Sequence, residues 1–375
     1  MLSKVIEENP VFEYFHPPFT GEERRGVHIR ATQGRGMQVV VLAGGVGSRL
    51  RPWTRTIPKP LLPVLDQTLL EHVVSSLPEG MVDEVIVAGG YKVDQIEAYF
   101  KNRETTFEVR IVPEDEPLGT GGALGNCRDV VSGTFACFNG DIVSSLDASQ
   151  LLALHRTNRS VGTLGLWEVE DPTRFGIVGL DESNRITQFK EKPAPEEVFS
   201  NLINAGSYIF EDDVFEWMPT GRHSIERDVF PALAAEGLLS GQAFEGYFID
   251  AGTPAAWNDA VAASILHRRF KTGHLTSDGF SWLADKALVN AVRGEAHLHH
   301  TMVSRGCSVG RSSLTSSTLL EGAFVGDEAV LDGCLVGKGA VIGNGCQLSH
   351  VVVDHGANVP ADTVMSGGTW PAEND

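Results

Sequence analysis

The pattern of apolar and polar positions along the chain changes twice, near residues 37 and 300. Residues 1–36 have no sustained periodicity, and we interpret them as an N-terminal extension outside the first core. From residue 37, short valine-rich runs predict buried strands and amphipathic stretches between them predict helices. Strands alternating with helices are typical of βαβ units. We therefore expect 37–265 to form a Rossmann-like α/β domain, with a mixed, mostly parallel sheet flanked by helices.

The individual elements of this region follow from the same pattern. The predicted strands are "MQVVVLAGG" (37–45), "DEVIVAGG" (83–90), "TFACFNGD" (134–141) and "VGTLGLWEV" (161–169). The predicted helices cover 69–78, 93–102, 147–157 and 254–270, and Thr253 and Pro254 are typical of the start of the last one. A hairpin is expected in "RFGIVGLDESNRI" (174–186), with its turn near Asp181–Asn184.

Beyond residue 300 the apolar residues recur every six positions, which fits neither a helix nor a single strand. Such a period is typical of a chain that coils around a triangular prism, with one short strand per hexad and one apolar side chain pointing inward. Interruptions near 315, 335 and 350 suggest only about three coils. The inward positions are predicted to be Val303, Val309, Leu319, Val325, Leu331, Val336, Ile342, Leu348, Val353 and Val359.

This repeat defines the remaining boundaries. We expect the β-helix over 301–366, a short tail over 367–375 and a linker over 266–300. The linker contains "HLHH" (297–300) close to Glu295, but this spacing matches no particular metal site.

Composition and charge restrict the classes of function. The chain has 375 residues, with 49 Asp and Glu against 30 Lys and Arg, a formal net charge of −19. This acidic balance argues against binding to nucleic acid or to anionic lipid. The sequence offers no apolar run long enough to span a bilayer and no secretion signal, and its five cysteines form no CxxC pair. We therefore expect a cytoplasmic protein with free thiols.

One basic stretch contradicts this acidic character. "LAGGVGSRLRPWTRTIPKPLLPV" (42–64) contains Arg49, Arg51, Arg55 and Lys59, and no Asp or Glu occurs between Glu23 and Asp66. The stretch is neither a Walker A loop nor a dinucleotide fingerprint. Backbone N–H groups of a glycine turn followed by unpaired cations suit phosphate oxygens, so a polyanionic ligand is expected here.

Carboxylates near strand ends are the second candidate feature. "FNGD" ends a strand at Asp141 and "GYFIDAGTP" ends another at Asp250. The carboxyl ends of strands in an α/β sheet face the ligand crevice, where two carboxylates could hold one Mg²⁺. In "FKEKP" (189–193), Glu191 and Lys192 would point to opposite faces of an extended segment unless the backbone twists.

Taken together, these motifs resemble those of the sugar-phosphate nucleotidylyltransferases. The cationic turn is close to that family's N-terminal motif, although Ser48 replaces the usual threonine. "EPLGTGGAL" (116–124), "NGD", "FGIV", "EKP", "NAGSYIF" (204–210), "SIERDVFP" (224–231) and "DAGTP" follow in the family's order. The hexad region is similar to the left-handed β-helix of the longer members, which include the GDP-mannose pyrophosphorylases.

The resemblance assigns roles to these positions. It implies a magnesium ion on Asp141 and Asp250, and catalytic roles for Arg49 and Lys59 on the triphosphate and for Lys192 on the sugar phosphate. It implies a sugar site at Gly176, Glu191, Lys192 and Asn204. The positions it places on the nucleotide are Leu42, Ala43, Gly44, Gly45, Gly119, Thr120, Gly121, Asn139 and Gly140.

The implied reaction joins an NTP to a sugar 1-phosphate, or to a cyclitol phosphate, and releases pyrophosphate. "PLGTGGAL" is most similar to guanylyltransferases, which favours GTP, while a dTTP- or UTP-using relative stays open. A non-catalytic regulatory subunit that binds a nucleotide-sugar is the main alternative. A second alternative, acyl transfer by the β-helix, would need a histidine such as His350 or His355. We expect the β-helix instead to drive homo-oligomer formation.

Overall fold

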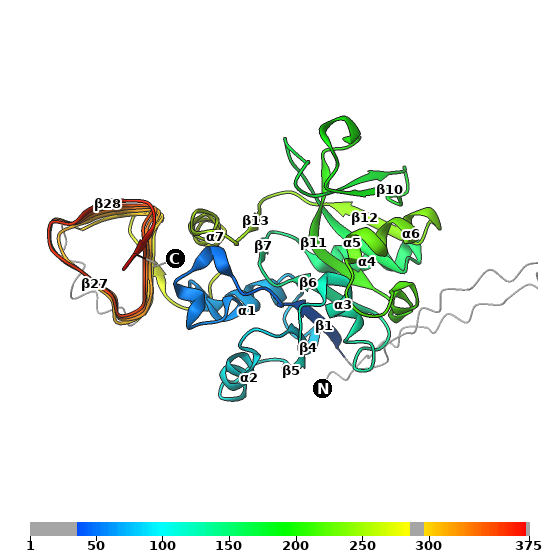
Figure 1. Ribbon diagram of the computed structural model, residues 1–375, viewed down its shortest axis with the longest axis horizontal. Coiled ribbons are helices and arrows are strands. Elements are labelled where there is room, and N and C mark those ends of the chain that lie inside the picture. The colour runs from blue at the N-terminus through cyan, green and yellow to red at the C-terminus, as the bar shows by residue number, and fades with distance from the viewer. Residues whose placement is uncertain (1–35, 286–295, 373–375) are drawn as a thin grey trace, which may run out of the picture.

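The structure is a computed structural model and describes residues 36–285 and 296–372. Its two parts are a sheet half (residues 37–266) and a β-helix (residues 282–285 and 296–370), which lie side by side with α7 and the segment around residues 48–65 between them (Figure 1).

The sheet half is built on a nine-stranded sheet with the order β10-β9-β11-β6-β1-β4-β5, to which β8 and β12 are added beside β11. The pairs of β1, β4, β5 and β6 among themselves are parallel, whereas β11 is antiparallel to β6 and β8. The predicted mixed sheet is therefore confirmed. Its strands are β1 (Met37–Leu42), β4 (Val82–Gly89), β5 (Glu108–Pro113), β6 (Phe135–Asn139), β8 (Gly162–Glu168), β9 (Gly176–Leu180), β10 (Ile186–Glu191), β11 (Leu202–Phe210) and β12 (Leu239–Ala243).

Helices cover both faces of this sheet, because the central strands β1, β4 and β6 have apolar side chains on both sides. One face packs against α1 (Leu69–Val74), α2 (Val93–Lys101) and α4 (Ala148–Asn158). The other face packs against α3 (Gly119–Gly125), α5 (Ile225–Asp228) and α6 (Phe230–Ala235). The sequence pattern did not predict α3, because four glycines in seven residues are unfavourable in a helix.

Two smaller features complete the sheet half. The predicted hairpin is present, since β9 and β10 pair antiparallel and Asn184 adopts the left-handed conformation in the turn. Helix α7 (Pro254–Leu266) begins as predicted, with the Thr253 hydroxyl accepting from the Ala256 N–H, but ends four residues earlier than expected.

Beyond residue 300 the strands form three parallel ladders that enclose a triangular interior (Figure 1). Four complete three-strand coils begin at β17 (Met302–Val303), β20 (Thr318–Leu319), β23 (Leu335–Val336) and β26 (Val352–Val353). All ten predicted inward residues are at most 2% exposed. The left-handed β-helix is therefore confirmed as the fold of this region.

The other strands of these coils form the two outer ladders. They are β16 (His297–His299), β18 (Ser308–Val309), β19 (Ser313–Thr315), β21 (Phe324–Val325), β22 (Val330–Asp332), β24 (Val341–Ile342), β25 (Gln347–Ser349), β27 (Asn358–Val359) and β28 (Val364–Ser366). The end strand β29 (Thr369–Trp370) extends the first ladder.

The expected number of about three coils is too low, and the interruptions explain why. Val336, Ile342, Leu348 and Val353 are successive inward residues, so a coil contains two steps of six residues and one of five. Three of the four coils have these 17 residues, and the first coil, from Met302 to Thr318, has 16. The shorter step ends at a corner where Gly333, His350 and Gly367, 17 residues apart, adopt left-handed conformations. The interruptions are thus a regular part of a 17-residue coil and do not end the repeat.

The β-helix also begins earlier than residue 301. Strand β15 (Trp282–Leu283) pairs in parallel with β17, and β16 pairs with β19. The interpretation of 266–300 as a linker is therefore wrong for these two segments. The alternation His-Leu-His in β16, with Leu298 buried and both neighbours exposed, is that of a strand.

The structure also tests the expectations about cysteines and membrane segments. All five cysteines are buried free thiols, as expected. Among the described residues, no helix combines the length and the apolar character needed to cross a bilayer.

Candidate active site

A cavity of about 380 Å³ opens where the parallel strands β1, β5 and β6 end. It contains eight of the nine positions expected to contact the nucleotide. The residues that line it are Leu42, Ala43, Gly44, Gly45, Lys59, Pro60, Glu114, Pro117, Gly119, Thr120, Ala123, Asn139, Gly140 and Asp141. The ninth position, Gly121, lies behind the wall, where a Cβ would come 2.3 Å from the Cδ2 atom of His223.

Close backbone packing forms the floor of this cavity. The Gly140 N–H donates to the Leu42 carbonyl over 3.0 Å, and a Cβ on Gly140 would lie 2.8 Å from the same oxygen. Any larger residue would separate the loops after β1 and β6. By contrast, nothing lies within 4 Å of a Cβ on Gly45, so this glycine leaves open space in the cavity itself.

The cationic turn folds into three short 3₁₀ helices, η1 (Ser48–Leu50), η2 (Trp53–Arg55) and η3 (Lys59–Leu61). Lys59 is 8% exposed, and its Nζ donates to Oδ2 of Asp141 over 2.9 Å. Arg49 is exposed, and its guanidinium lies beside Gly252, since a Cβ there would be 2.6 Å from one terminal nitrogen. The turn therefore places one buried cation in the cavity wall and one exposed cation beside Gly252 and Asp250.

Asp250 lies beside Asp141, but it does not end a strand of the main sheet as expected. It ends strand β13 (Phe248–Asp250), which pairs antiparallel with β7 (Ile142–Ser144) outside the main sheet. The Ala251 N–H donates to the Asp141 carbonyl over 2.9 Å, which fixes the two acidic residues side by side.

The electrostatics of Asp250 show that all four charged groups are neighbours. Burial raises the pKa of Asp250, and the negative charge of Asp141 raises it further, whereas Lys59 and Arg49 oppose this. Two carboxylates that destabilise each other's charge form a favourable environment for a cation. Among the described residues, no group of three or more His, Cys, Asp or Glu could hold a metal, so a metal here would need oxygens from a ligand or water.

The positions expected to contact the sugar form a separate group on β9, β10 and β11. Glu191 lies opposite Gly176 in the hairpin, and a Cβ on Gly176 would be 2.9 Å from Oε2 of Glu191. Lys192 has φ 47°, so the backbone twists at this residue, and its Nζ lies 3.2 Å from Oε1 of Glu191. Both side chains therefore lie on one side of the hairpin. Asn204 donates to the Tyr208 hydroxyl over 2.9 Å.

Sequence reasoning missed one acidic residue of the cavity, Glu114. It directly follows β5, and its Oε2 accepts from the Leu118 N–H over 3.2 Å. Its Oε1 is buried without a hydrogen-bond partner and lies 3.4 Å from where a Cβ of Gly44 would be. The signal available in the sequence was the alternating run Glu108–Pro113 directly before Glu114, which was not among the predicted strands.

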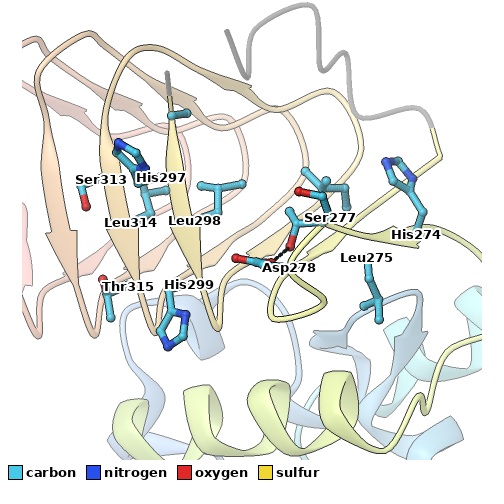
Figure 2. A pocket seen from close by; sticks show the side chains of 13 residues that line it. His274, Leu275, Ser277, Asp278, His297, Leu298, His299, Ser313, Leu314 and Thr315 are labelled. Carbon is cyan, nitrogen blue, oxygen red and sulfur yellow. Dashed lines mark hydrogen bonds between the residues drawn. The ribbon is translucent and has the colours of Figure 1, made fainter. Parts of the chain in front are cut away.

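A larger cavity, of about 600 Å³, lies away from this site where the chain enters the β-helix (Figure 2). His297 and His299 project from β16 and His274 lies on the opposite wall, so the three imidazoles do not converge. The expectation that the "HLHH" segment is a structural segment and not a metal site stays a prediction, since Glu295 lies outside the described residues.

With this geometry established, comparison with known proteins defines the class. Residues 38–265 match the family model described as nucleotidyl transferase, and residues 285–369 match the model described as GlmU-like, C-terminal hexapeptide. The chain belongs to the nucleotidyl transferase family and is a nucleotidyltransferase enzyme.

Several named proteins are similar to it. The chain is 36% identical over 303 residues to a mannose-1-phosphate guanylyltransferase of Mycobacterium tuberculosis, covering 78% of this chain and 80% of that protein. It is 36% identical over 225 residues to the mannose-1-phosphate guanylyltransferase catalytic subunit beta of Xenopus tropicalis, where the match covers 58% of this chain and 62% of the relative.

Solved structures support the same fold. HddC from Yersinia pseudotuberculosis is 30% identical with a TM-score of 0.50, and the match covers 60% of this chain and 98% of that one. A second HddC structure with the same scores is complexed with GMP-PN.

Proposed function

We propose that this protein is a sugar-1-phosphate nucleotidylyltransferase that uses GTP by preference and releases pyrophosphate. The observation that carries the proposal is that Arg49 and Asp250 lie beside Lys59 and Asp141, which line a cavity with a glycine-rich floor. Two of these residues come from the cationic turn and two from distant strands. Cations and a carboxylate pair at one place suit a metal-bound triphosphate.

The proposed reaction is a direct displacement. A phosphate oxygen of the sugar 1-phosphate forms a bond to the α-phosphorus, and the bond from that phosphorus to the bridging oxygen of pyrophosphate breaks. The attacking oxygen is already an anion at neutral pH, so no general base is required. Catalysis then rests on positioning two mutually repelling anions and on stabilising the charge that develops on the leaving group.

Each charged residue has a defined part in this scheme. Arg49 and Lys59 bind the phosphates that leave, and Lys192 guides the attacking sugar phosphate. Glu191, Gly176 and Asn204 bind the sugar itself. Lys192 is suited to its part because its side chain is 57% exposed, and it can turn from Glu191 towards an incoming phosphate.

A divalent metal fits the acidic pair. Family members usually depend on such an ion, and we propose Mg²⁺ because it prefers carboxylate, phosphate and water oxygens. Asp141 and Asp250 would hold it, and the ion would supply charge neutralisation at the phosphates. Lys59 bonds to only one oxygen of Asp141, which leaves the other available.

Glu114 supports the choice of guanine. One oxygen of its carboxylate is buried without a hydrogen-bond partner. In the strand order β6-β1-β4-β5, Asp141 follows β6, Gly44 follows β1 and Glu114 follows β5, so the Gly44 loop lies between the two carboxylates. The Watson–Crick edge of guanine offers two adjacent donors, N1–H and the 2-amino group, which a carboxylate can accept together. Uracil and thymine offer one donor between two carbonyls, and adenine offers an acceptor at N1. A buried carboxylate therefore favours guanine over the other bases.

The test is pyrophosphate release from the four common NTPs and dTTP, each with a panel of sugar 1-phosphates. We expect GTP with a hexose phosphate such as mannose 1-phosphate, the substrate named for the relatives, to give the fastest release. Binding of a GDP-sugar without any turnover would favour a regulatory subunit instead. A preference for dTTP or UTP would contradict the guanine assignment alone.

A matched pair of variants tests Glu114 directly. Glu114→Gln replaces one acceptor oxygen by a donor amide, and we expect the preference for GTP over UTP to fall about 10- to 100-fold. Glu116→Gln removes the same charge two residues away, on an exposed side chain outside the cavity, and should leave the preference unchanged. Equal preferences in the two variants would remove Glu114 from base recognition.

Self-association through the β-helix also remains a proposal. It is supported by large apolar side chains that are exposed on the two outer ladders, Phe324, Val330, Val341 and Val364. A second copy of the chain is the proposed occupant of this surface. Light scattering of the wild type and of a Phe324→Ser variant tests it, and a monomeric wild type would contradict it.

A further inference from the structure

The cationic turn contacts the β-helix on the side that faces away from the cavity. Leu50 and Trp53 are completely buried, while Arg49 and Arg51, beside Leu50, are exposed. The two buried side chains belong to an apolar cluster shared by both parts of the molecule. The β-helix contributes the outward-facing residues of one ladder and its turns, Met302, Leu320, Leu335 and Val352.

Trp53 makes the most specific contact across this interface. Its indole N–H donates to the Val353 carbonyl over 2.9 Å, in a buried bond between residues 300 positions apart. Its ring stacks on His355 with a centroid distance of 5.8 Å and an interplanar angle of 21°. Burial lowers the pKa of His355, so this imidazole is a neutral stacking partner at pH 7. A buried indole N–H needs such an acceptor, because leaving it unpaired is costly.

From Trp53 a short path leads to both cations. The hydroxyl of the next residue, Thr54, donates to the Gly47 carbonyl over 2.8 Å. Gly47 precedes η1, in which Arg49 lies, and has φ 63°. A Cβ on Gly47 would lie only 3.4 Å from the Cβ of Lys59, so this backbone packs directly against the second cation.

The acidic pair is held at the same interface. Ala251, which follows Asp250, is buried in the shared cluster together with Trp257 of α7. On α7, the Asn258 side chain accepts from the Thr318 hydroxyl of the β-helix over 2.8 Å in a buried bond. One face of the β-helix therefore contacts both the segment that carries the cations and the segment that follows the carboxylates.

We propose that Trp53 is a positioning residue through which the β-helix fixes Arg49 and Lys59 relative to Asp141 and Asp250. The inference rests on the proposed transferase function. In a reaction that depends on placing anions, a displacement of about 1 Å can cost about 100-fold in rate. Because a β-helix is a stack of hydrogen-bonded coils, it gives a rigid reference frame for a turn that contains little regular structure.

The test compares Trp53→Phe with a matched control. Phenylalanine retains the ring that stacks on His355 but loses the N–H that bonds to Val353. Trp282→Phe is the control, since Trp282 is 1% exposed, belongs to the same cluster and donates to the Thr272 carbonyl over 3.1 Å. Both variants lose one buried indole donor, but only one of these donors lies on the cationic turn.

We expect Trp53→Phe to lower kcat/KM for the nucleotide about tenfold or more, and Trp282→Phe to stay within about twofold of the wild type. Their melting temperatures should fall by similar amounts. Equal kinetics in the two variants would show that Trp53 only packs, and would overturn the proposal. If Trp53→Phe does not fold, His355→Leu, which removes the stacked ring from the β-helix side, replaces it in the same comparison.

Calorimetric titration with GTP and Mg²⁺ separates this inference from the proposed function. A wild type that releases no pyrophosphate would contradict the transferase activity, yet the positioning of the cations would still be measured as nucleotide affinity. Weaker binding in Trp53→Phe than in Trp282→Phe would support the inference. Equal affinities would refute it.

Discussion

The sheet half and the β-helix are both built largely from parallel strands, but they use the ends of these strands differently. In the sheet half the strands β1, β5 and β6 end at one edge, and loops of unequal length bring Gly44, Glu114 and Asp141 to one cavity. In the β-helix each strand has two or three residues and ends at a corner that directs the chain into the next ladder.

This difference explains where the chemistry lies. Unequal loops at a common edge let residues from distant parts of the sequence converge. In the β-helix, corresponding residues of successive coils stack on one another at similar corners. Their side chains therefore form columns along the outside of the β-helix. Among the described residues, the charged groups of the β-helix accordingly form surface pairs such as Lys338 with Glu321, 2.7 Å apart. The β-helix provides a frame, and the sheet half provides the site.

The largest effect on turnover is expected from a substitution of Asp141, which tests whether the chemistry lies in the sheet half. Asp141→Asn keeps an oxygen that accepts from Lys59 but loses the charge that would hold a metal. We expect turnover to fall about 10²–10³-fold, or ~3–4 kcal/mol of transition-state stabilisation. Asp332→Asn, on an exposed position of β22, is the control and should be fully active. Normal turnover of folded Asp141→Asn at limiting Mg²⁺ would refute the metal assignment.

The next effect concerns stability in acid, which should differ between the two parts. His72 in α1 is 2% exposed, and burial lowers its pKa from 6.5 to about 4. The unfolded chain therefore binds a proton that the folded chain does not. The stability due to neutral His72 is present above pH 6.5 and is lost as the pH falls towards 4, by about 3 kcal/mol. In the β-helix, Cys307 and Cys334 have pKa values raised by burial to about 11 and do not titrate in this range. His355 of the β-helix, whose pKa burial lowers, acts in the same direction as His72 but is only partly buried.

Urea unfolding between pH 7 and 4.5 measures this loss. The His72→Gln variant retains a donor for the Val64 carbonyl, which His72 contacts over 2.8 Å, and should show a smaller loss in acid. An unchanged pH dependence in this variant would assign the acid sensitivity to other groups.

The smallest effects come from two glycines, one in each part. The substitution in the β-helix should change stability alone, and the substitution in the sheet half should change nucleotide binding alone. Gly339 in the β-helix has φ 67° and open space around it, so Gly339→Ala should cost about 1 kcal/mol of stability without changing activity. Gly45 also has open space but no positive φ, and Gly45→Ala should leave the melting temperature unchanged while weakening nucleotide binding. Thermal melting and nucleotide titration of both variants check these opposite expectations for melting temperature and nucleotide affinity. A loss of activity in Gly339→Ala would contradict the division of roles.

Much of the fold could be predicted because local periodicity is strong in both parts. Short apolar runs marked β1, β4, β6 and β8, and amphipathic stretches marked α1, α2 and α4, but the pattern did not mark β5 or α3 beside the cavity. The six-residue period marked the inward residues from Val303 to Val359. The number of coils was underestimated because the five-residue step was interpreted as an interruption, although it recurs in every coil at the corner of Gly333 and His350.

The candidate site was only partly predictable. The Gly44 loop and Asp141 follow strand ends and Lys59 belongs to the cationic turn, so all three could be inferred from the sequence. The route of Asp250 could not, because it depends on the pairing of β13 with β7 outside the main sheet. Glu114 was missed because its importance depends on burial without a partner, which local sequence does not reveal.

The sequence by itself determined the valine-rich strands, the amphipathic helices, the hexad repeat and the set of residues able to bind phosphate, since these depend on side-chain chemistry and on spacing along the chain. Only the tertiary structure decided that Asp250 lies beside Asp141, that the backbone twist at Lys192 turns its side chain towards Glu191, and that Trp53 joins the cationic turn to the β-helix. The physical reason is that these contacts connect residues up to 300 positions apart, and they form only when apolar surfaces from both parts of the chain are buried together.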